Sequence, residues 1–304
     1  MPPVLIIEGP DGAGKTTLCN YLVKKGFRYF HEGPPPAEGD MIEYYAAKLW
    51  KAMHSRSPVV FDRFHLGEMI YGPIARNNDR VGYYGMRMFR RVFRSQAVRC
   101  VIAAPPWEIC YQNWKKKFEA GDDYLRSASK FKDCYHRFMG LSAYHHTFDY
   151  TQISIENWYL NYFKSGDMNK ETFPAWAIGC PSARFLIIGE RTNGTETDFP
   201  FFNSKNSSRF LNEALWEAGY HEDELMFTNT FSRKGNARDI RQVSDRLRGV
   251  TVALAFGESA QEACRKADIP FVSLMRPACF FRFHQKRRSE FVNKLREVRE
   301  FKWK

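Results

Sequence analysis

The sequence predicts an α/β protein with two domains, each a sheet flanked by helices. Three observations support this expectation. Short apolar runs alternate with longer helical segments, a pattern typical of a parallel sheet with helices on both faces. The alternation breaks around residues 165–183 and starts again with an apolar run at residues 184–190. With 304 residues, 44% of them hydrophobic, the chain is long enough for two cores. We therefore expect domains at residues 1–165 and 180–304.

The first half contains three expected strands separated by helices. The strands are the apolar runs Val4–Ile7, Val59–Asp62 ("VVFD") and residues 98–106 ("VRCVIAAPP"). The segments "DMIEYYAAKLWKAMH" and "YYGMRMFRRVFRSQ" between them have the apolar spacing of helices. Residues 31–40 ("HEGPPPAEGD") are rich in proline and glycine, which indicates a loop.

The second half repeats this organisation after the segment "SGDMNKETFPAWAIGCPSA", which we expect to be a linker. A strand at residues 184–190 ("RFLIIGE") is followed by an amphipathic helix at residues 207–220. The further expected strands are residues 224–230, 250–257 and 269–275. The segment "ESAQEACRKAD" forms a helix between the last two strands, and "RSEFVNKLREVREFKWK" forms a basic helix at the end.

Composition limits the classes of partner and compartment. No apolar run is long enough for a membrane helix, and no signal peptide is recognised, so no membrane partner is expected. Seven scattered cysteines without a C-x-x-C pair favour a reducing compartment. The net charge is +12, and residues 233–304 hold 18 Lys and Arg against 8 Asp and Glu. Such a basic segment suits a polyanion, although a solvated basic surface remains an alternative.

The stretch "EGPDGAGKTT", residues 8–17, carries the most specific motif. A glycine, four residues and then Gly-Lys-Thr form the complete P-loop pattern, here between a strand and a helix. Backbone N–H groups of such a turn surround phosphate oxygens, and the helix directs its positive end at the same anion. Lys15 would reach the β- and γ-phosphates, and Thr16 would hold Mg²⁺. The motif therefore predicts ATP and Mg²⁺ as cofactors. The expected nucleotide-binding residues are Gly9, Asp11, Gly12, Ala13, Gly14, Lys15, Thr16 and Thr17.

Asp62 and Arg63 end the second expected strand, where P-loop kinases place a carboxylate and an arginine beside the transferred phosphate. Asp62 is our candidate to accept a proton, and ordering the P-loop lysine or a metal-bound water is an equally open role. Arg63 would stabilise the charge of the moving phosphoryl group. The predicted catalytic residues are Asp62, Lys15 and Arg63.

Two basic segments lie near the third expected strand. Arg87, Arg91 and Arg94 share one helical face by their spacing, and we predict that they contact the substrate or DNA. The segment "NWKKKFEAGDDYLRS" (113–127) has the place of a mobile lid over the phosphates. The lid lysines expected to help bind the nucleotide are Lys115, Lys116 and Lys117. Ordinary surface charge remains open for the lysines. A surface salt bridge remains open for one of the four arginines of this helix, which also include Arg90.

Residues 1 to about 160 resemble the thymidylate kinase family, through "IIEGPDGAGKTT", "FDRFHLGE" and the basic lid followed by "DDYLRS". The resemblance implies a P-loop α/β kinase fold, Mg-ATP as donor and a pyrimidine deoxynucleotide as acceptor. It also makes a homodimer possible. The lid departs from the family because it carries lysines where many relatives have arginines.

Residues 184 to about 290 resemble the uracil-DNA glycosylase superfamily, through "FLIIGE", "FPFF" (199–202), "RFLNEALWEAGYHEDELMFTN", "VALAFGESAQEAC" and "MRPACFFR". The resemblance implies that Phe201 stacks on a pyrimidine, that Asn229 hydrogen-bonds its edge, and that the loop 276–282 touches DNA. The family's loop histidine is replaced by Arg276, and the pocket loop reads "RTNGTETD". Glycosidic cleavage is therefore not expected.

The combination of both halves resembles the bacteriophage 5-hydroxymethyl-deoxyuridine DNA kinases. That resemblance implies transfer of the ATP γ-phosphate to the hydroxymethyl oxygen of 5-hydroxymethyluracil in DNA, giving 5-phosphomethyl-deoxyuridine during viral thymidine hypermodification. The partner would then be DNA containing 5-hydroxymethyluracil, and the location the cytoplasm of the infected host cell. Two alternatives stay open. One is a thymidylate or hydroxymethyl-deoxyuridylate kinase of free nucleotides, and the other a DNA-binding or repair module driven by a P-loop.

Overall fold

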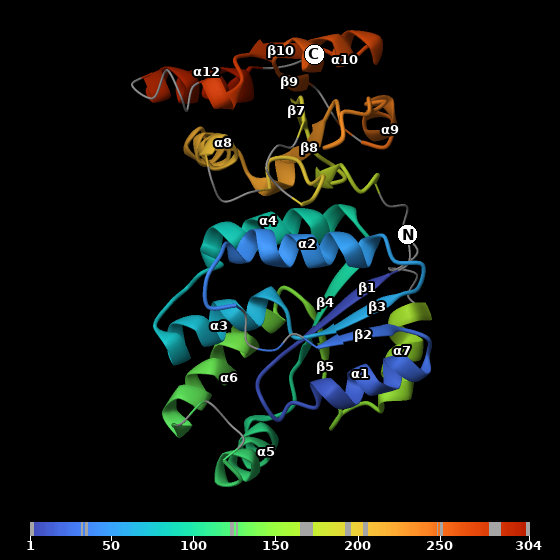
Figure 1. The fold of residues 1–304 in the computed structure, drawn as a ribbon, viewed down its shortest axis with the longest axis vertical. Coiled ribbons are helices and arrows are strands. Elements are labelled where there is room, and N and C mark those ends of the chain that lie inside the picture. The colour runs from blue at the N-terminus through green and yellow to red at the C-terminus, as the bar shows by residue number, and fades with distance from the viewer. Residues whose placement is uncertain are drawn as a thin grey trace. The chain divides into compact units, whose positions relative to one another are not determined.

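The computed structural model describes residues 3–31, 33, 36–121, 125, 127–164, 173–191, 196–202, 206–247, 249, 252–279 and 287–301. The chain divides into two compact units (Figure 1). Unit 1 comprises Met1–Met86 and Ala97–Glu171, and unit 2 comprises Arg87–Gln96 and Thr172–Lys304. In the described residues each unit contains a five-stranded sheet with flanking helices, which confirms the predicted α/β class.

The sheet of unit 1 is parallel, with the order β2-β3-β1-β4-β5. The expected strands are confirmed as β1 (Val4–Glu8), β3 (Val59–Asp62) and β4 (Val98–Ala103). Their residues are almost all buried, because helices cover both faces. The edge strands, β2 (Arg28–His31) and β5 (His146–Phe148), were not expected, since neither has a continuous apolar run.

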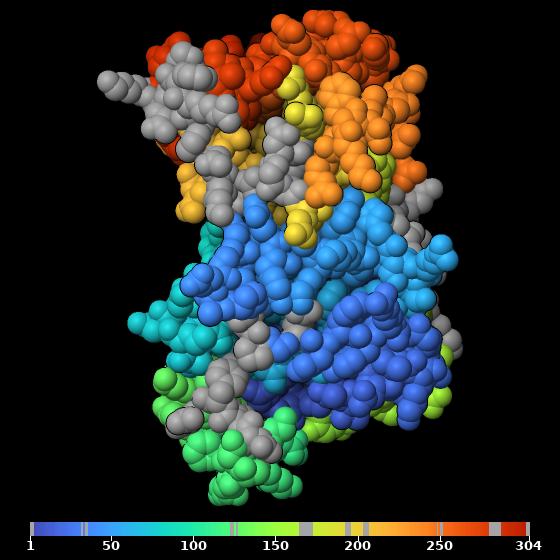
Figure 2. Space-filling model, viewed as in Figure 1, coloured from blue at the N-terminus to red at the C-terminus, as the bar shows by residue number. Residues whose placement is uncertain are grey.

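Helices α1 (Lys15–Lys24) and α7 (Ile155–Lys164) pack on one face of this sheet through a shared core that includes Leu18, Leu22 and Trp158. The outer side of α1 forms part of the surface of unit 1 seen in Figure 2 (dark blue). A second core joins three more helices. These are α3 (His65–Arg76), α5 (Trp107–Glu119) and α6 (Ala128–Ser142).

Two helices remain in this part of the chain. Helix α2 (Met41–Met53) begins after Asp40, whose side chain accepts hydrogen bonds from the N–H groups of Ile42 and Glu43. Helix α4 (Gly82–Ser95) contributes to both units, since the division of the chain falls at Arg87.

The sheet of unit 2 has the order β10-β9-β7-β8-β6, and only β6 runs antiparallel to its neighbour among the strands described. The four expected strands are confirmed. They are β7 (Phe185–Gly189), β8 (Leu225–Asn229), β9 (Val252–Phe256) and β10 (Phe271–Leu274). Strand β6 (Ile178–Gly179) lies within the expected linker, of which residues 165–172 are outside the described residues.

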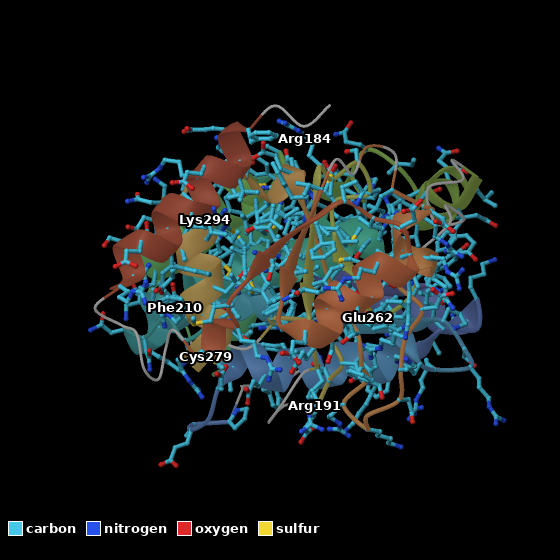
Figure 3. The ribbon with its side chains drawn as sticks, turned by 90° about the horizontal axis from the view of Figure 1, so that it is seen from above. Arg184, Arg191, Phe210, Glu262, Cys279 and Lys294 are labelled. Atoms are coloured by element: carbon cyan, nitrogen blue, oxygen red, sulfur yellow. The ribbon has the colours of Figure 1, made fainter. Side chains whose placement is uncertain are left out.

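Helices also cover both faces of the second sheet, as Figure 3 shows with Glu262 of α10 and Lys294 of α12 on opposite sides. Helices α9 (Arg241–Ser244) and α10 (Glu258–Lys266) share a core with Leu186 and Ile188 of β7. On the other face lie α8 (Asn206–Glu217) and α12 (Arg288–Glu300), joined by the ring contact of Phe210 and Phe291. Within the described parts of the chain, no helix combines the length and apolarity needed to cross a bilayer.

Candidate functional site

The P-loop lies at the carboxyl edge of the unit 1 sheet, as the strand–turn–helix pattern predicts. Strand β1 is buried throughout and ends at Glu8, and α1 begins at Lys15 after Gly14, whose φ is 80°. Thr16 and Thr17 on the first turn of α1 are exposed. The positive end of the helix at this exposed turn suits an anion.

Helix α5 holds the P-loop in place from outside. The Nδ2 of Asn113 donates a hydrogen bond to the carbonyl of Gly12 over 2.9 Å. A Cβ at Gly12 would lie 2.7 Å from the Cβ of Asn113 and 2.8 Å from the carbonyl oxygen of Cys110. This close approach, together with a φ of 77°, requires glycine at position 12.

Lys15 is almost fully buried inside the loop. Its Nζ donates to the carbonyl oxygens of Gly9 and Pro10 over 2.8 and 2.7 Å, and it lies 3.9 Å from Oδ1 of Asp11. Burial, and secondly the neighbouring guanidinium of Arg63, lower the pKa of Lys15 to about 8. In this structure the ammonium binds the carbonyls of the P-loop itself, and its binding of phosphate oxygens stays a prediction.

Asp62 joins the end of β3 to the start of α1. Its Oδ2 accepts a hydrogen bond from Oγ1 of Thr16 at 2.6 Å and from the hydroxyl of Tyr29 at 3.1 Å, and Nδ1 of His31 lies 3.7 Å away. Asp62 is 1% exposed, and its Oδ1 accepts no hydrogen bond from any described residue. A buried carboxylate oxygen without a partner marks a place where a ligand can bind.

The donor set around Asp62 suits a hard divalent cation. A carboxylate and the hydroxyl of Thr16 meet there, and oxygen ligands are those that Mg²⁺ prefers. The residues present therefore fit the expected Mg²⁺ site.

Arg63 follows Asp62 in a strained backbone conformation. Its φ is 73°, which is uncommon for a residue other than glycine, and its N–H donates to the carbonyl of Ile7 over 2.9 Å. Its guanidinium forms an ion pair with Asp11. Burial alone would raise the pKa of Asp11, but Lys15 and Arg63 hold it below its usual value. Strain of this kind clusters at functional sites.

Glu8 belongs to this site and was not predicted. Its Oε1 accepts hydrogen bonds from the N–H groups of Phe64, Leu66 and Gly67 at 2.9, 3.0 and 3.1 Å. The carboxylate thus clamps the turn that carries Asp62 and Arg63. Burial raises the pKa of Glu8 to about 7. The available signal was a carboxylate at the end of a buried strand, directly before the P-loop.

The three predicted lid lysines lie on the last turns of α5. Lys115 is paired with Glu119 at 3.7 Å, with both side chains exposed. Lys117 is close enough to Asp11 to lower the pKa of that carboxyl. Residues 122–124 and 126 of the expected lid lie outside the described residues. A role of these lysines over the phosphates stays a prediction.

The three predicted arginines of α4 belong to unit 2 and bind carboxylates there. Arg87 lies 3.2 Å from Oε1 of Glu222, and Arg94 forms an ion pair with Asp223. Arg91 is 1% exposed and is enclosed rather than presented to a ligand. The predicted contact of Arg91 with DNA does not fit its burial, and contact of Arg87 and Arg94 with DNA stays a prediction.

Phe201 and Asn229 come together at the carboxyl edge of the unit 2 sheet. Gly189 ends β7 and is in register with Asn229, the end of β8. A Cβ at Gly189 would lie 2.6 Å from Oδ1 of Asn229 and 2.6 Å from Cζ of Phe201, so only glycine fits beneath both side chains. The connection after β7 leads to β8 and the connection after β9 leads to β10 on the opposite side, so the switch point of the strand order lies between β7 and β9, next to Gly189. Open α/β sheets bind ligands at such points.

Arg276 lies at the same edge, after β10. Its Nη2 is 2.6 Å from Oε1 of Glu190, which also accepts a hydrogen bond from Oγ of Ser259 at 3.2 Å. A Cβ at Gly257 would lie 2.6 Å from Nε of Arg276, so the arginine crosses the end of β9. Residues 192–195 of the predicted pocket loop and 280–282 of the predicted DNA loop lie outside the described residues.

No family model matches this chain, and no curated protein matches it significantly. Solved structures of similar arrangement include the YorR protein of Bacillus subtilis in complex with phosphorylated GDP, at 14% identity and a TM-score of 0.43. That match covers 55% of this chain and 99% of YorR. Deoxyadenosine kinase of M. mycoides with bound dATP matches at 15% identity and a TM-score of 0.37, covering 53% of this chain and 98% of the kinase. These values assign the chain to no family.

Proposed function

We propose that this protein transfers the γ-phosphate of ATP to the hydroxymethyl oxygen of 5-hydroxymethyluracil in DNA. The observation that carries the phosphotransfer is the meeting of Thr16 with Asp62 beside the P-loop. One carboxylate oxygen there is held by hydroxyl donors, while the other has no hydrogen bond from the described residues. This arrangement provides both a triphosphate cradle and a proton acceptor.

The chain's own groups suffice to bind the donor. The ammonium of Lys15 exchanges the carbonyls of Gly9 and Pro10 for β- and γ-phosphate oxygens, and the N–H groups at the start of α1 receive the same anion. Thr16 would hold Mg²⁺, which when bound neutralises charge on the phosphates. Arg63, whose guanidinium is paired with Asp11, would stabilise charge on the transferred group.

The acceptor is a hydroxyl group, which must lose its proton as it attacks. Oδ1 of Asp62 accepts that proton, the acceptor oxygen forms a bond to the γ-phosphorus, and the bond from the γ-phosphorus to the β–γ bridging oxygen breaks, releasing ADP. An acceptor that is already ionised, such as a nucleotide phosphate, would not need this carboxylate as a base. As a base Asp62 would serve an alcohol acceptor, whereas as part of the Mg²⁺ site it would serve either kind of acceptor, so the acceptor is decided by the labelled-ATP experiment.

The choice of a DNA base is supported by unit 2. Phe201 and the buried residue Asn229 lie together at the carboxyl edge of the sheet, and an aromatic ring and an amide are the groups that stack on a base and read its edge. Residues 233–304 add 18 basic against 8 acidic residues, as neutralisation of a phosphate backbone requires. A 5-hydroxymethyl group supplies the alcohol that thymine lacks.

Labelled ATP tests this proposal against its alternatives. The protein is given DNA containing 5-hydroxymethyluracil, free hydroxymethyl-deoxyuridylate with thymidylate, and ordinary DNA in separate reactions. Label in the modified polymer supports the proposal. Label in free nucleotides instead would favour a nucleotide kinase, and release of phosphate alone would favour a P-loop switch in a DNA-binding module.

A further inference from the structure

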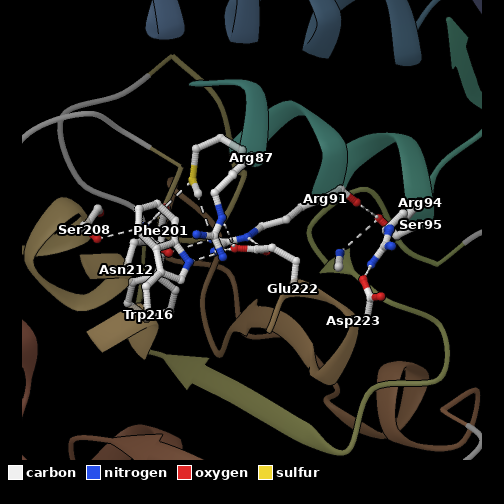
Figure 4. A network of polar contacts seen from close by, with 12 residues as sticks. Arg87, Arg91, Arg94, Ser95, Phe201, Ser208, Asn212, Trp216, Glu222 and Asp223 are labelled. Atoms are coloured by element: carbon white, nitrogen blue, oxygen red, sulfur yellow. Dashed lines mark hydrogen bonds and ion pairs between the residues drawn. The ribbon is translucent and has the colours of Figure 1, made fainter. Parts of the chain in front are cut away.

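Helix α4 places one enclosed arginine in unit 2. Nε and Nη2 of Arg91 donate hydrogen bonds to the two carboxylate oxygens of Glu222 over 2.6 and 2.8 Å (Figure 4). A bidentate pair of this kind fixes the plane of the guanidinium as well as its position. The hydrogen bond from Nε1 of Trp216 to Glu222, at 2.9 Å, holds the carboxylate from another side.

The remaining nitrogen of Arg91 determines how the amide of Asn212 faces. Nη1 donates to Oδ1 of Asn212 over 2.7 Å. Because a guanidinium can only donate, only the amide oxygen can face it. The amide nitrogen must then point away, where it donates to the carbonyl oxygens of Phe201 and Ser208 at 3.0 and 2.8 Å. Asn212 is fully buried, so no solvent water competes for its hydrogen-bond partners and the orientation of its amide is fixed.

Phe201 needs such support because its backbone is strained. Its φ is 52°, a left-handed conformation that is rare for an aromatic residue and persists only where neighbours hold it. Its ring meets Phe227 edge-on, with centroids 6.1 Å apart. The guanidinium carbon of Arg91 lies 3.8 Å from the centre of the same Phe227 ring. Arg91 therefore reaches Phe201 by two routes, through Asn212 to its carbonyl and through Phe227 to its ring.

We infer that Arg91 and Asn212 are positioning residues for Phe201 and thereby set the affinity of unit 2 for a pyrimidine base. The inference rests on the proposed function, in which Phe201 and Asn229 hold that base. The amide of Asn212 keeps the ring of Phe201 over Gly189, beside the amide of Asn229. Without the hydrogen bond from Nδ2 of Asn212, the backbone at Phe201 relaxes toward an unstrained conformation. The ring of Phe201 then moves away from Gly189.

The substitution Asn212→Asp tests this step. Aspartate keeps an oxygen for Arg91, but its second oxygen faces the carbonyls of Phe201 and Ser208 and repels them. Binding is measured with two single-stranded oligonucleotides of one sequence, carrying 5-hydroxymethyluracil or an abasic site at the same position. We expect the preference of the wild type for the base to fall about tenfold, since stacking on one aromatic contributes about that factor. Affinity for the abasic strand and ATP hydrolysis stay unchanged. The matched control is Asn157→Asp on the exposed side of α7, which should leave the preference intact.

A second substitution separates this inference from the proposed function. Phe201→Gly accepts the left-handed backbone but removes the ring, so it should lose the same preference, and adding Asn212→Asp should cause no further loss. If the wild type shows no preference for the base, the proposed function fails. If Phe201→Gly loses the preference while Asn212→Asp keeps it, only the inference on positioning is overturned.

Should circular dichroism show Asn212→Asp unfolded, Arg91→Lys replaces it. Lysine retains a positive charge beside Glu222 but cannot donate to Glu222 and Asn212 in one fixed plane. A preference reduced to the level of Phe201→Gly supports the inference. A preference equal to that of the wild type contradicts it.

Discussion

Thr16 donates a hydrogen bond to Asp62 over 2.6 Å and so joins the first turn of α1 to the end of β3. The two residues are 46 positions apart in the sequence. Their meeting places the residue expected to hold Mg²⁺ and the residue expected to accept a proton beside the same phosphates. P-loop switches also combine a Ser or Thr hydroxyl with a carboxylate to hold Mg²⁺. The pair therefore fits nucleotide binding in either class, and the fate of the label from ATP distinguishes a transferase from a switch.

Asp62→Asn should abolish most phosphoryl transfer while leaving nucleotide binding without Mg²⁺ nearly intact. Asparagine keeps the shape of the side chain and an acceptor for Thr16, but its amide cannot take up the acceptor's proton. We expect kcat to fall about 10²- to 10⁴-fold, the usual contribution of a positioned base. Because the same carboxylate belongs to the expected Mg²⁺ site, nucleotide binding is measured with and without Mg²⁺, and a loss of affinity confined to the Mg²⁺ series would assign Asp62 to the metal instead. Asp133→Asn on the exposed side of α6 is the matched control. Normal turnover in Asp62→Asn would remove this residue from the mechanism.

Two substitutions at Arg63 separate the effect of its backbone conformation on stability from the effect of its charge on activity. At a φ of 73°, glycine adopts the conformation without strain, whereas alanine does not. We expect Arg63→Gly and Arg63→Ala to lose transfer equally, because both lack the guanidinium. Arg63→Ala should be less stable than Arg63→Gly by about 1 kcal/mol in urea unfolding. Full activity in Arg63→Gly would show that the guanidinium is dispensable.

Gly189→Ala should damage base binding in unit 2 and leave the P-loop untouched. The new Cβ would lie 2.6 Å from both Oδ1 of Asn229 and Cζ of Phe201. We expect loss of binding to DNA with 5-hydroxymethyluracil but unchanged ATP hydrolysis. Gly140→Ala in α6 is the control, because nothing lies within 4 Å of its added Cβ. Unchanged binding of the modified DNA by Gly189→Ala would show that the base binds at another site.

Glu8 should make stability depend on pH. Burial raises its pKa from 4.5 to about 7, so between these values the folded chain holds a proton that the unfolded chain has lost. The free energy of unfolding then falls as pH rises through this window, by about 3 kcal/mol for this group, and levels off above it. Glu8→Gln cannot titrate, so its unfolding free energy should lack this fall. Identical pH profiles for the two proteins in urea unfolding would contradict the assignment.

Glu222→Gln should destabilise unit 2 strongly. The substitution leaves the buried guanidinium of Arg91 without its counter-charge, which we expect to cost about 3 kcal/mol. Glu213→Gln is the matched control. Its carboxylate pairs at the surface with Arg209 at 2.7 Å and should change stability by less than about 1 kcal/mol. Equal urea midpoints for both variants would show that the Arg91 pair is not needed for stability.

Local features of this protein were predictable from the sequence, and distant pairings were not. The P-loop was predicted because its residues are consecutive, and the central strands because they are uniformly apolar. Strand β2 was not predicted because its side chains are exposed or only half-buried, so "RYFH" lacks an apolar pattern. The spacing of the α4 arginines indicated a shared face. It could not show that Glu222, 131 residues beyond Arg91, would lie against that face.

The same difference between local features and distant pairings holds for the candidate site. The sequence pointed to Asp62, Phe201 and Asn229 one at a time, through motifs and resemblance. The side chains of Phe201 and Asn229 both lie against Gly189. This contact depends on the register of β7 and β8, which no short-range sequence pattern encodes. Glu8 acts through backbone groups 56 to 59 residues away, and its role became visible only in the folded chain.

The most direct measurement is the mass of the nucleosides released from DNA after reaction. DNA containing 5-hydroxymethyluracil is incubated with ATP and the protein of residues 1–304 and then freed of nucleotides. It is digested to nucleosides under conditions that leave a phosphate on the 5-hydroxymethyl oxygen in place. We expect a nucleoside heavier than 5-hydroxymethyl-deoxyuridine by one phosphoryl group, absent with Lys15→Ala. Unmodified 5-hydroxymethyl-deoxyuridine from the polymer, together with a phosphorylated free nucleotide in the parallel reaction, would contradict the proposed acceptor.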